Sequence, residues 1–247
     1  MSVQQTAAAP ARKQARRSPF DRETAARLAG AEYARVADLL ATLTTEQWAA
    51  DSGCPGWDVR AMAGHMLGMT QMAASRRELV GQLVKTLLRV RRDGGLLIDA
   101  LTAHQVAKNA RLSTGELVAE WRRLTPRAVH FRTRLPRLLR GRAMKDEQFG
   151  WWTFGYLMDV ITTRDPFMHR IDISRATGRD MVATADHEGV LVDDVVHEWA
   201  DRHGMPFVLD LSGPAGGHWQ VGEDGVHLTM DAFDFCRVLS GRERGEG

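Results

Sequence analysis

Residues 164–172 read RDPFMHRID and place the carboxylate of Asp165 and the imidazole of His169 four positions apart. On a helix, this spacing puts both side chains on one face, one turn apart. Pro166 leaves two arrangements open. Asp165 caps a helix that begins at Pro166, or the helix runs through Pro166 with a kink. In the second case the kink frees backbone groups near the middle of a bundle, where a site can lie.

A second histidine, His65, ends the stretch WDVRAMAGH at residues 57–65. Asp58 is predicted to cap a helix that runs to about Val80 and carries a methionine-rich face. His65 lies on that face and is expected to point inward. A single inward histidine is more often a hydrogen-bonded core residue than a metal ligand. Together with the 165/169 pair, however, it makes three N/O donors, the number typical of a catalytic zinc site with one open position.

The rest of the first 180 residues follows a helical pattern. Ser18 is predicted to cap the first helix, and the capping box of Ser113 and Glu116 opens another that ends before Pro136. Gly178 is predicted to end the helix that contains Asp165. We expect further helices over residues 96–109 and 186–203.

After Gly178 the pattern changes. Short strands are predicted over residues 207–211, 218–221 and 226–230, followed by a helix over 232–239. The turn 223–225 is predicted to join the last two strands as a hairpin. The sequence therefore predicts a mainly α protein, with a helical bundle followed by a small α+β domain.

The composition bears on which kinds of partner and which cellular compartment are expected. The 247 residues are 44% hydrophobic and 26% charged, with a net charge of +2, which gives no reason to expect a nucleic acid or a membrane surface as partner. No apolar run approaches the roughly 20 residues of a membrane span, and no phosphate-binding glycine loop is present. The two cysteines, Cys54 and Cys236, cannot form a disulfide framework, so we expect a reducing, cytoplasmic environment. Residues 1–17 are expected to be a disordered tail rather than a signal peptide.

Two motifs carry a family resemblance. Residues 54–60, CPGWDVR, lead to His65, and residues 164–178 run from Asp165 through His169 to ATG. These motifs, with LTTEQW at 43–48, resemble the DinB-like superfamily and, within it, the mycothiol-dependent maleylpyruvate isomerase family. The similarity spans about residues 20–242. It implies a DinB-like four-helix, metal-binding bundle over 18–180 and a sterol-carrier-protein-like domain over 181–247.

The resemblance also implies a metal site. The first metal histidine of the family corresponds to His65, and its carboxylate and second histidine correspond to Asp165 and His169. The isomerase has glutamate where this chain has the shorter Asp165. The implied ion is a divalent metal, usually zinc, although such a donor set also suits iron or nickel.

The family's cosubstrate is the low-molecular-weight thiol mycothiol, and its substrates are small electrophiles. The implied function is isomerisation of a substrate or S-transfer to it. Arg242 resembles a C-terminal Gly-Arg element of the family that would act as a catalytic residue by orienting a substrate carboxylate. The alternative, which the sequence favours, is an exposed arginine of the tail. Asp172 is either an acceptor behind an imidazole or a surface ion-pair partner, and Cys54 is a nucleophile or a loop residue.

Two other functions remain open. The scaffold also suits a thiol-independent, pathway-specific metalloenzyme, or a non-catalytic ligand-binding or regulatory protein. No patch in the sequence demands a partner subunit, so either a monomer or a dimer is expected.

Overall fold

The computed structural model describes residues 14–146 and 150–243. Contacts divide the chain into two compact units. We call Phe20–Arg140 with Gly155–Met181 the helical unit, and Met1–Pro19, Gly141–Phe154 and Val182–Gly247 the mixed unit. This division is consistent with a mainly helical fold followed by a small sheet region.

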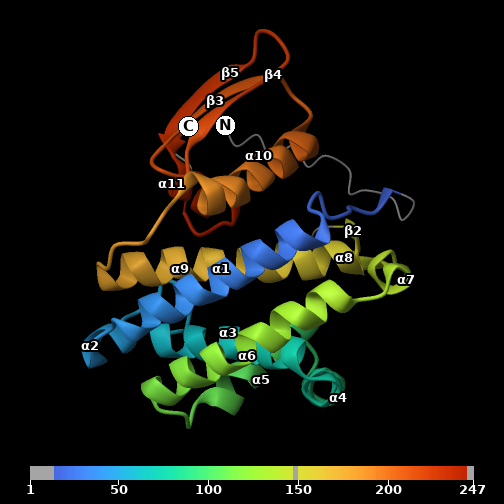
Figure 1. Cartoon of the computed structure of the whole chain (residues 1–247), viewed down its shortest axis with the longest axis vertical. Coiled ribbons are helices and arrows are strands. Elements are labelled where there is room, and N and C mark those ends of the chain that lie inside the picture. The colour runs from blue at the N-terminus through green and yellow to red at the C-terminus, as the bar shows by residue number, and fades with distance from the viewer. Residues whose placement is uncertain (1–13, 147–149, 244–247) are drawn as a thin grey trace. The chain divides into compact units, whose positions relative to one another are not determined.

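Four long helices of the helical unit form a bundle: α1 (Arg22–Ala41), α3 (Val59–Ala74), α6 (Thr114–Arg134) and α9 (Thr162–Thr177). Each contacts two of the others, in the order α1–α6–α3–α9, and Figure 1 shows α1 beside α9. Two further helices, α4 (Arg76–Asp93) and α5 (Leu97–Asn109), pack against α3. The short helices are α2 (Thr45–Trp48), α7 (Arg137–Arg140) and α8 (Phe154–Tyr156).

The bundle encloses an apolar core. Trp121 of α6 is buried against Tyr33 of α1, with ring centroids 5.3 Å apart, and its indole N–H donates to the Tyr33 carbonyl at 2.8 Å. Burial of such large aromatic rings is a main source of packing energy. Other core residues from α1, α3, α6 and α9 are Val36, Leu40, Met62, Met66, Leu124 and Ile173.

Two helix boundaries differ from the sequence prediction. The helix that was expected to reach Val80 ends at Ala74, because Ser75 adopts an extended conformation and its hydroxyl caps α4. The cap of α1 is Asp21, whose carboxylate accepts from the Thr24 N–H at 2.7 Å, and not Ser18. In both places the helix boundary is set by a residue whose side chain accepts a hydrogen bond from the backbone of the helix that follows, namely Ser75 and Asp21.

The mixed unit contains two small sheets. Strands β1 (Ala143–Asp146) and β2 (Gly150–Thr153) are antiparallel and were not predicted. The second sheet has the order β4–β3–β5, with β3 (Phe207–Ser212) antiparallel to β4 (Gly217–Val221) and parallel to β5 (Val226–Asp231). Helices α10 (Val190–His203) and α11 (Ala232–Leu239) contact each other, and the π-helical segment η3 (Ala185–Gly189) precedes α10.

The predicted hairpin of residues 218–230 is wrong. The strands β4 and β5 lie on opposite sides of β3 instead of pairing. The turn crosses the beginning of β3 so closely that a Cβ on Gly225 would lie 2.3 Å from the backbone nitrogen of Phe207. The glycine thus serves a close backbone approach and not a two-strand turn.

The predicted tail over 1–17 is described only from residue 14 onward, and residues 1–13 lie outside the described part. Arg16 forms backbone hydrogen bonds with Trp151 and Thr153 of β2. In the described residues, no helix combines the length and apolar composition that a bilayer span requires.

Candidate metal centre

His65 is positioned by the start of α3. The carboxylate of Asp58 accepts from the Ala61 N–H at 2.7 Å and caps the helix, as the sequence predicted. Two turns later His65 faces the interior, with 5% of its side chain exposed. Glycines at 64 and 68 flank it and let α5 approach α3 closely.

Asp165 and His169 lie on a helix that runs through Pro166. The segments α8, η2 (Leu157–Ile161) and α9 follow one another without a break, so Asp165 lies within the helical run and does not cap a helix. Because Pro166 has no N–H, the Thr162 carbonyl lacks its usual helical donor. The hydroxyl of Tyr33 donates to this carbonyl at 3.4 Å. The alternative in which a helix begins at Pro166 is therefore wrong.

The structure brings the three predicted ligands together. The Nε2 atoms of His65 and His169 each lie 3.5 Å from a carboxylate oxygen of Asp165. One donor atom from each residue lies within 4.8 Å of the other two. The imidazole rings are nearly perpendicular, at 88°, with centroids 5.5 Å apart. Helices α3 and α9, neighbours in the bundle, thus direct three donors to one point.

The distances from the two imidazoles to Asp165 are longer than those of good hydrogen bonds. A good N–H···O bond measures about 2.7–3.2 Å. Two ligand atoms bound to tetrahedral zinc at about 2.0–2.2 Å are themselves about 3.3–3.5 Å apart. The 3.5 Å separations, which run to the two different oxygens of Asp165, are compatible with an ion held among these donors.

Each imidazole has a partner behind it. The Nδ1 of His65 lies 2.8 Å from the amide oxygen of Gln105, and the Nδ1 of His169 lies 3.3 Å from a carboxylate oxygen of Asp172. Metal-binding histidines usually donate their other N–H to such an acceptor, which orients the ring. Of the two roles considered for Asp172, the structure supports the acceptor behind an imidazole.

The three donors are strongly coupled electrostatically. Burial by itself would raise the pKa of Asp165, but the charges of His169 and His65 outweigh it and hold the pKa well below its usual range. Burial would lower the pKa of His169, yet Asp165, Asp172 and Cys54 together raise it well above its ordinary value. Positive charge at this point is therefore stabilised by the protein.

Trp57 and Cys54 border the cluster. The Trp57 ring centroid lies 5.2 Å from that of His65 and 6.3 Å from that of His169. The Cys54 sulfur lies 3.8 Å from an Asp172 oxygen. One possible ligand atom from each of Cys54, His169 and Asp172 lies within 4.8 Å of the other two. Asp165 has the most accessible of the three donor side chains, at 30% exposed. The open side of the cluster is therefore at Asp165.

Arg242 lies in the mixed unit just after α11, where its backbone N–H donates to the Arg237 carbonyl, and its catalytic role stays a prediction.

Gln105 was not recognised from the sequence. The available signal was that Gln105 and Asn109 place two amides, four residues apart, on the buried face of α5.

Solved structures share this fold. The chain matches a crystal structure of the mycothiol-dependent maleylpyruvate isomerase with a TM-score of 0.56, and one of a mutant of that isomerase with a TM-score of 0.57. Both matches have 14% sequence identity and cover 91% of this chain and 90% of the solved chain. At this identity the likeness establishes the fold.

Sequence comparison establishes the family. Uncharacterized proteins of Mycobacterium tuberculosis strains H37Rv and CDC 1551 / Oshkosh are each 26% identical over 215 residues, covering 83% of this chain and 79% of theirs. The model of the mycothiol maleylpyruvate isomerase N-terminal domain matches residues 29–174, which contain all three donors of the cluster. With well over half of its length matched by that model, the chain belongs to the mycothiol maleylpyruvate isomerase N-terminal domain family.

Proposed function

We propose that this protein is a metal-dependent enzyme that uses mycothiol to isomerise, or to transfer sulfur to, a small electrophile. His65, Asp165 and His169 would hold the divalent ion, for which zinc is the best fit. The observation that carries the proposal is that both Nε2 atoms lie at ligand spacing, 3.5 Å, from one carboxylate. Both rings are also held from behind at Nδ1.

The bound ion would supply a positive charge that deprotonates a thiol at neutral pH. The residues around it set the direction of approach. Gln105 and Asp172 hold the imidazoles, Trp57 covers one side, and access remains beside Asp165.

In the isomerisation that we propose, the thiolate sulfur adds to one carbon of a cis double bond and a proton adds where the negative charge develops. Rotation about the resulting single bond and loss of the same thiol then give the trans isomer. Nothing is oxidised or reduced, and the thiol is regenerated. In S-transfer, the sulfur instead displaces a leaving group or opens an epoxide.

The first test is the metal content of the purified protein, measured by elemental mass spectrometry without exposure to chelators. We expect about one zinc per chain in the wild type and in His130→Ala, which removes an exposed histidine of α6. His65→Ala and His169→Ala should lose the zinc. A wild-type protein that neither contains a divalent metal nor binds added zinc, iron or nickel would overturn the proposal.

Use of the thiol is tested after cobalt substitution. Mycothiol should change the visible spectrum of the Co²⁺ protein, because sulfur coordination adds charge-transfer absorption. A Co²⁺ spectrum unaffected by saturating mycothiol would contradict the thiol chemistry and favour a thiol-independent metalloenzyme. An affinity for mycothiol that is unchanged in His65→Ala would favour a non-catalytic binding protein.

A further inference from the structure

We propose that Gln105 is the positioning residue of His65, which fixes the imidazole in the form that presents a free Nε2 lone pair to the ion. The inference rests on the proposed metal site and adds to it a residue from α5, outside the four-helix bundle. Gln105 is fully buried, and its amide oxygen lies 2.8 Å from His65 Nδ1. Since a carbonyl oxygen only accepts, His65 must carry its proton at Nδ1.

The orientation of the Gln105 amide is set by its other end. The Nε2 group lies 3.2 Å from the Gln82 side-chain oxygen and 3.4 and 3.2 Å from the sulfurs of Met69 and Met72. All three are acceptors, and the thioethers are weak ones. Reversing the amide would place its oxygen against the oxygen of Gln82 and the two sulfurs, and would leave the buried N–H₂ group without these acceptors. The oxygen therefore faces His65.

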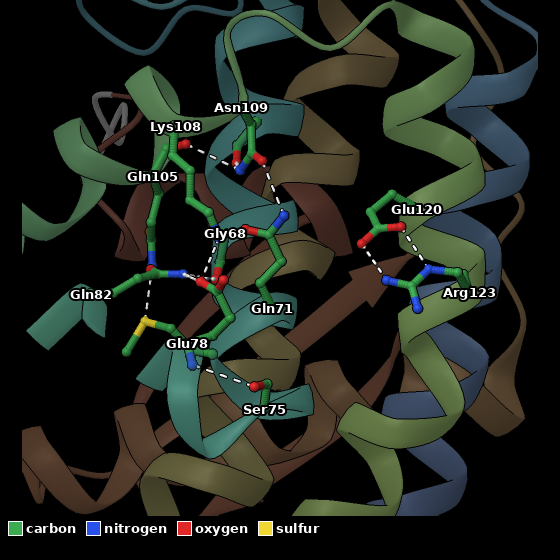
Figure 2. Close-up of polar contacts among 12 residues, drawn as sticks. Gly68, Gln71, Ser75, Glu78, Gln82, Gln105, Lys108, Asn109, Glu120 and Arg123 are labelled. Atoms are coloured by element: carbon green, nitrogen blue, oxygen red, sulfur yellow. Dashed lines mark hydrogen bonds and ion pairs between the residues drawn. The ribbon is translucent and has the colours of Figure 1, made fainter. Parts of the chain in front are cut away.

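The side-chain amide of Gln82, the next group in the chain of contacts after Gln105, is oriented in the same way. Its Nε2 donates to the Gly68 carbonyl at 3.2 Å and to the Glu78 carboxylate at 3.3 Å, neither of which can donate. Its own oxygen must then face Gln105. Glu78 in turn accepts from the ammonium group of Lys108. Figure 2 shows this chain of contacts, which runs from Gln105 through Gln82 to Glu78.

The Gly68 carbonyl and the Glu78 carboxylate thus fix the orientation of the Gln82 amide, which in turn fixes that of the Gln105 amide. Gly68 provides the necessary space, because a Cβ at that position would lie 2.5 Å from both Cβ and Cγ of Gln105. Such a distance is far inside van der Waals contact. Residues of α3, α4 and α5 therefore form a site that holds the side-chain amide of Gln105 in one orientation.

A neutral amide behind His65 also balances the charge of the site. Asp165 is a ligand and Asp172 stands behind His169, so the two carboxylates match the two charges of a divalent ion. A carboxylate at position 105 would add a third negative charge to a buried cluster. Gln105 supplies the required acceptor without that charge.

The test compares Gln105→Leu with Gln105→Glu. Gln105→Leu removes the acceptor with little change of volume, and we expect zinc affinity to fall about 10- to 100-fold, measured by competition with a chromophoric chelator. Gln105→Glu keeps an acceptor behind His65 but places its second oxygen against the Gln82 oxygen, so it should lose less zinc affinity than Gln105→Leu without reaching the wild-type value. Asn109→Leu is the matched control. Its amide is also buried, one turn further along α5, and donates to the Gly64 carbonyl at 2.8 Å without contacting an imidazole.

Thermal unfolding of the metal-free variants separates positioning from folding. Gln105→Leu and Asn109→Leu should both lower the melting temperature, and only Gln105→Leu should weaken zinc binding. A second readout is the ¹⁵N spectrum of the neutral imidazole of His65, which should show Nδ1–H in the wild type and a mixture of tautomers in Gln105→Leu.

Two results would overturn the proposal. One is a folded Gln105→Leu that binds zinc as tightly as the wild type, and the other is an equal loss of affinity in Asn109→Leu. A wild-type protein without zinc affinity would instead refute the metal site itself. These failures are distinguishable, because the last one is seen before any variant is made.

Discussion

At the scale of single residues, Gly68 gives a direct test of the packing beside His65. We expect Gly68→Ala to destabilise the protein by about 1–3 kcal/mol, because the added methyl group overlaps buried atoms of Gln105. Elsewhere on a helix the same substitution stabilises by roughly 0.5–1 kcal/mol. Urea unfolding of the metal-free protein measures the difference.

Gly81→Ala is the matched control, since Gly81 lies within α4 and a Cβ there would contact nothing within 4 Å. It should raise the free energy of unfolding. If Gly68→Ala also raised it, the tight packing between α3 and α5 would be refuted.

The ligands and their outer partners differ in how well the sequence predicts them. Asp165 and His169 are four residues apart on a helix, so their proximity was predictable from spacing, whereas their meeting with His65 was implied by the family resemblance. Gln105 stands in no recognisable motif, and its contact with His65 joins two helices at positions 40 residues apart in the sequence. The direction of an amide depends on partners from three helices, and no local pattern records it.

At the scale of elements, the passage of the helix through Pro166 depends on Tyr33. The Tyr33 hydroxyl replaces the donor that proline removes from the Thr162 carbonyl. Tyr33→Phe should therefore cost about 1 kcal/mol in the wild type. In a Pro166→Ala background the helix regains its own N–H, and the same substitution should cost less.

A double-mutant cycle by denaturant unfolding measures this coupling. The second contact of the hydroxyl, with Arg132 at 3.3 Å, is lost in both backgrounds and cancels. A coupling energy of zero would show that the carbonyl is satisfied in some other way.

Helix ends were predictable where a side chain or a glycine marks them. Asp58, Ser113 and Gly178 stand at the boundaries that the sequence indicated. Ser75 was missed because apolar residues continue at helical spacing on both sides of it. The pairing of β5 with β3 was missed because a short turn predicts a hairpin, whereas the close approach of Gly225 to Phe207 is a tertiary contact.

At the scale of the whole molecule, stability should depend on pH in opposite ways with and without metal. In the metal-free protein the pKa of His169 is raised by folding. The stability that His169 contributes is therefore fully present below its unfolded pKa of about 6.5, and is lost as pH rises through its folded pKa. The lowered pKa of Asp165 makes its contribution complete above its unfolded value of about 3.9 and lost as pH falls through the folded pKa. Between these limits the metal-free protein should be most stable.

Zinc requires neutral imidazoles, so protons compete with it. The increase in melting temperature on adding zinc should therefore grow as pH rises from about 6.5 through the raised pKa of His169, measured against a chelator-treated sample. The metal-free His169→Ala variant should lack the alkaline loss. An increase of the same size across this range would contradict the coupling of zinc to His169.

The order of the three proposed ligands along the chain also has a consequence for biosynthesis. His65 is made early, whereas Asp165 and His169 come 100 and 104 residues later, on the last helix of the bundle. A nascent chain that stops before α9 has only one of the three donors. We therefore expect the ion to be acquired only after almost the whole bundle has left the ribosome, so that its arrival closes a long loop and marks the end of assembly of the helical unit.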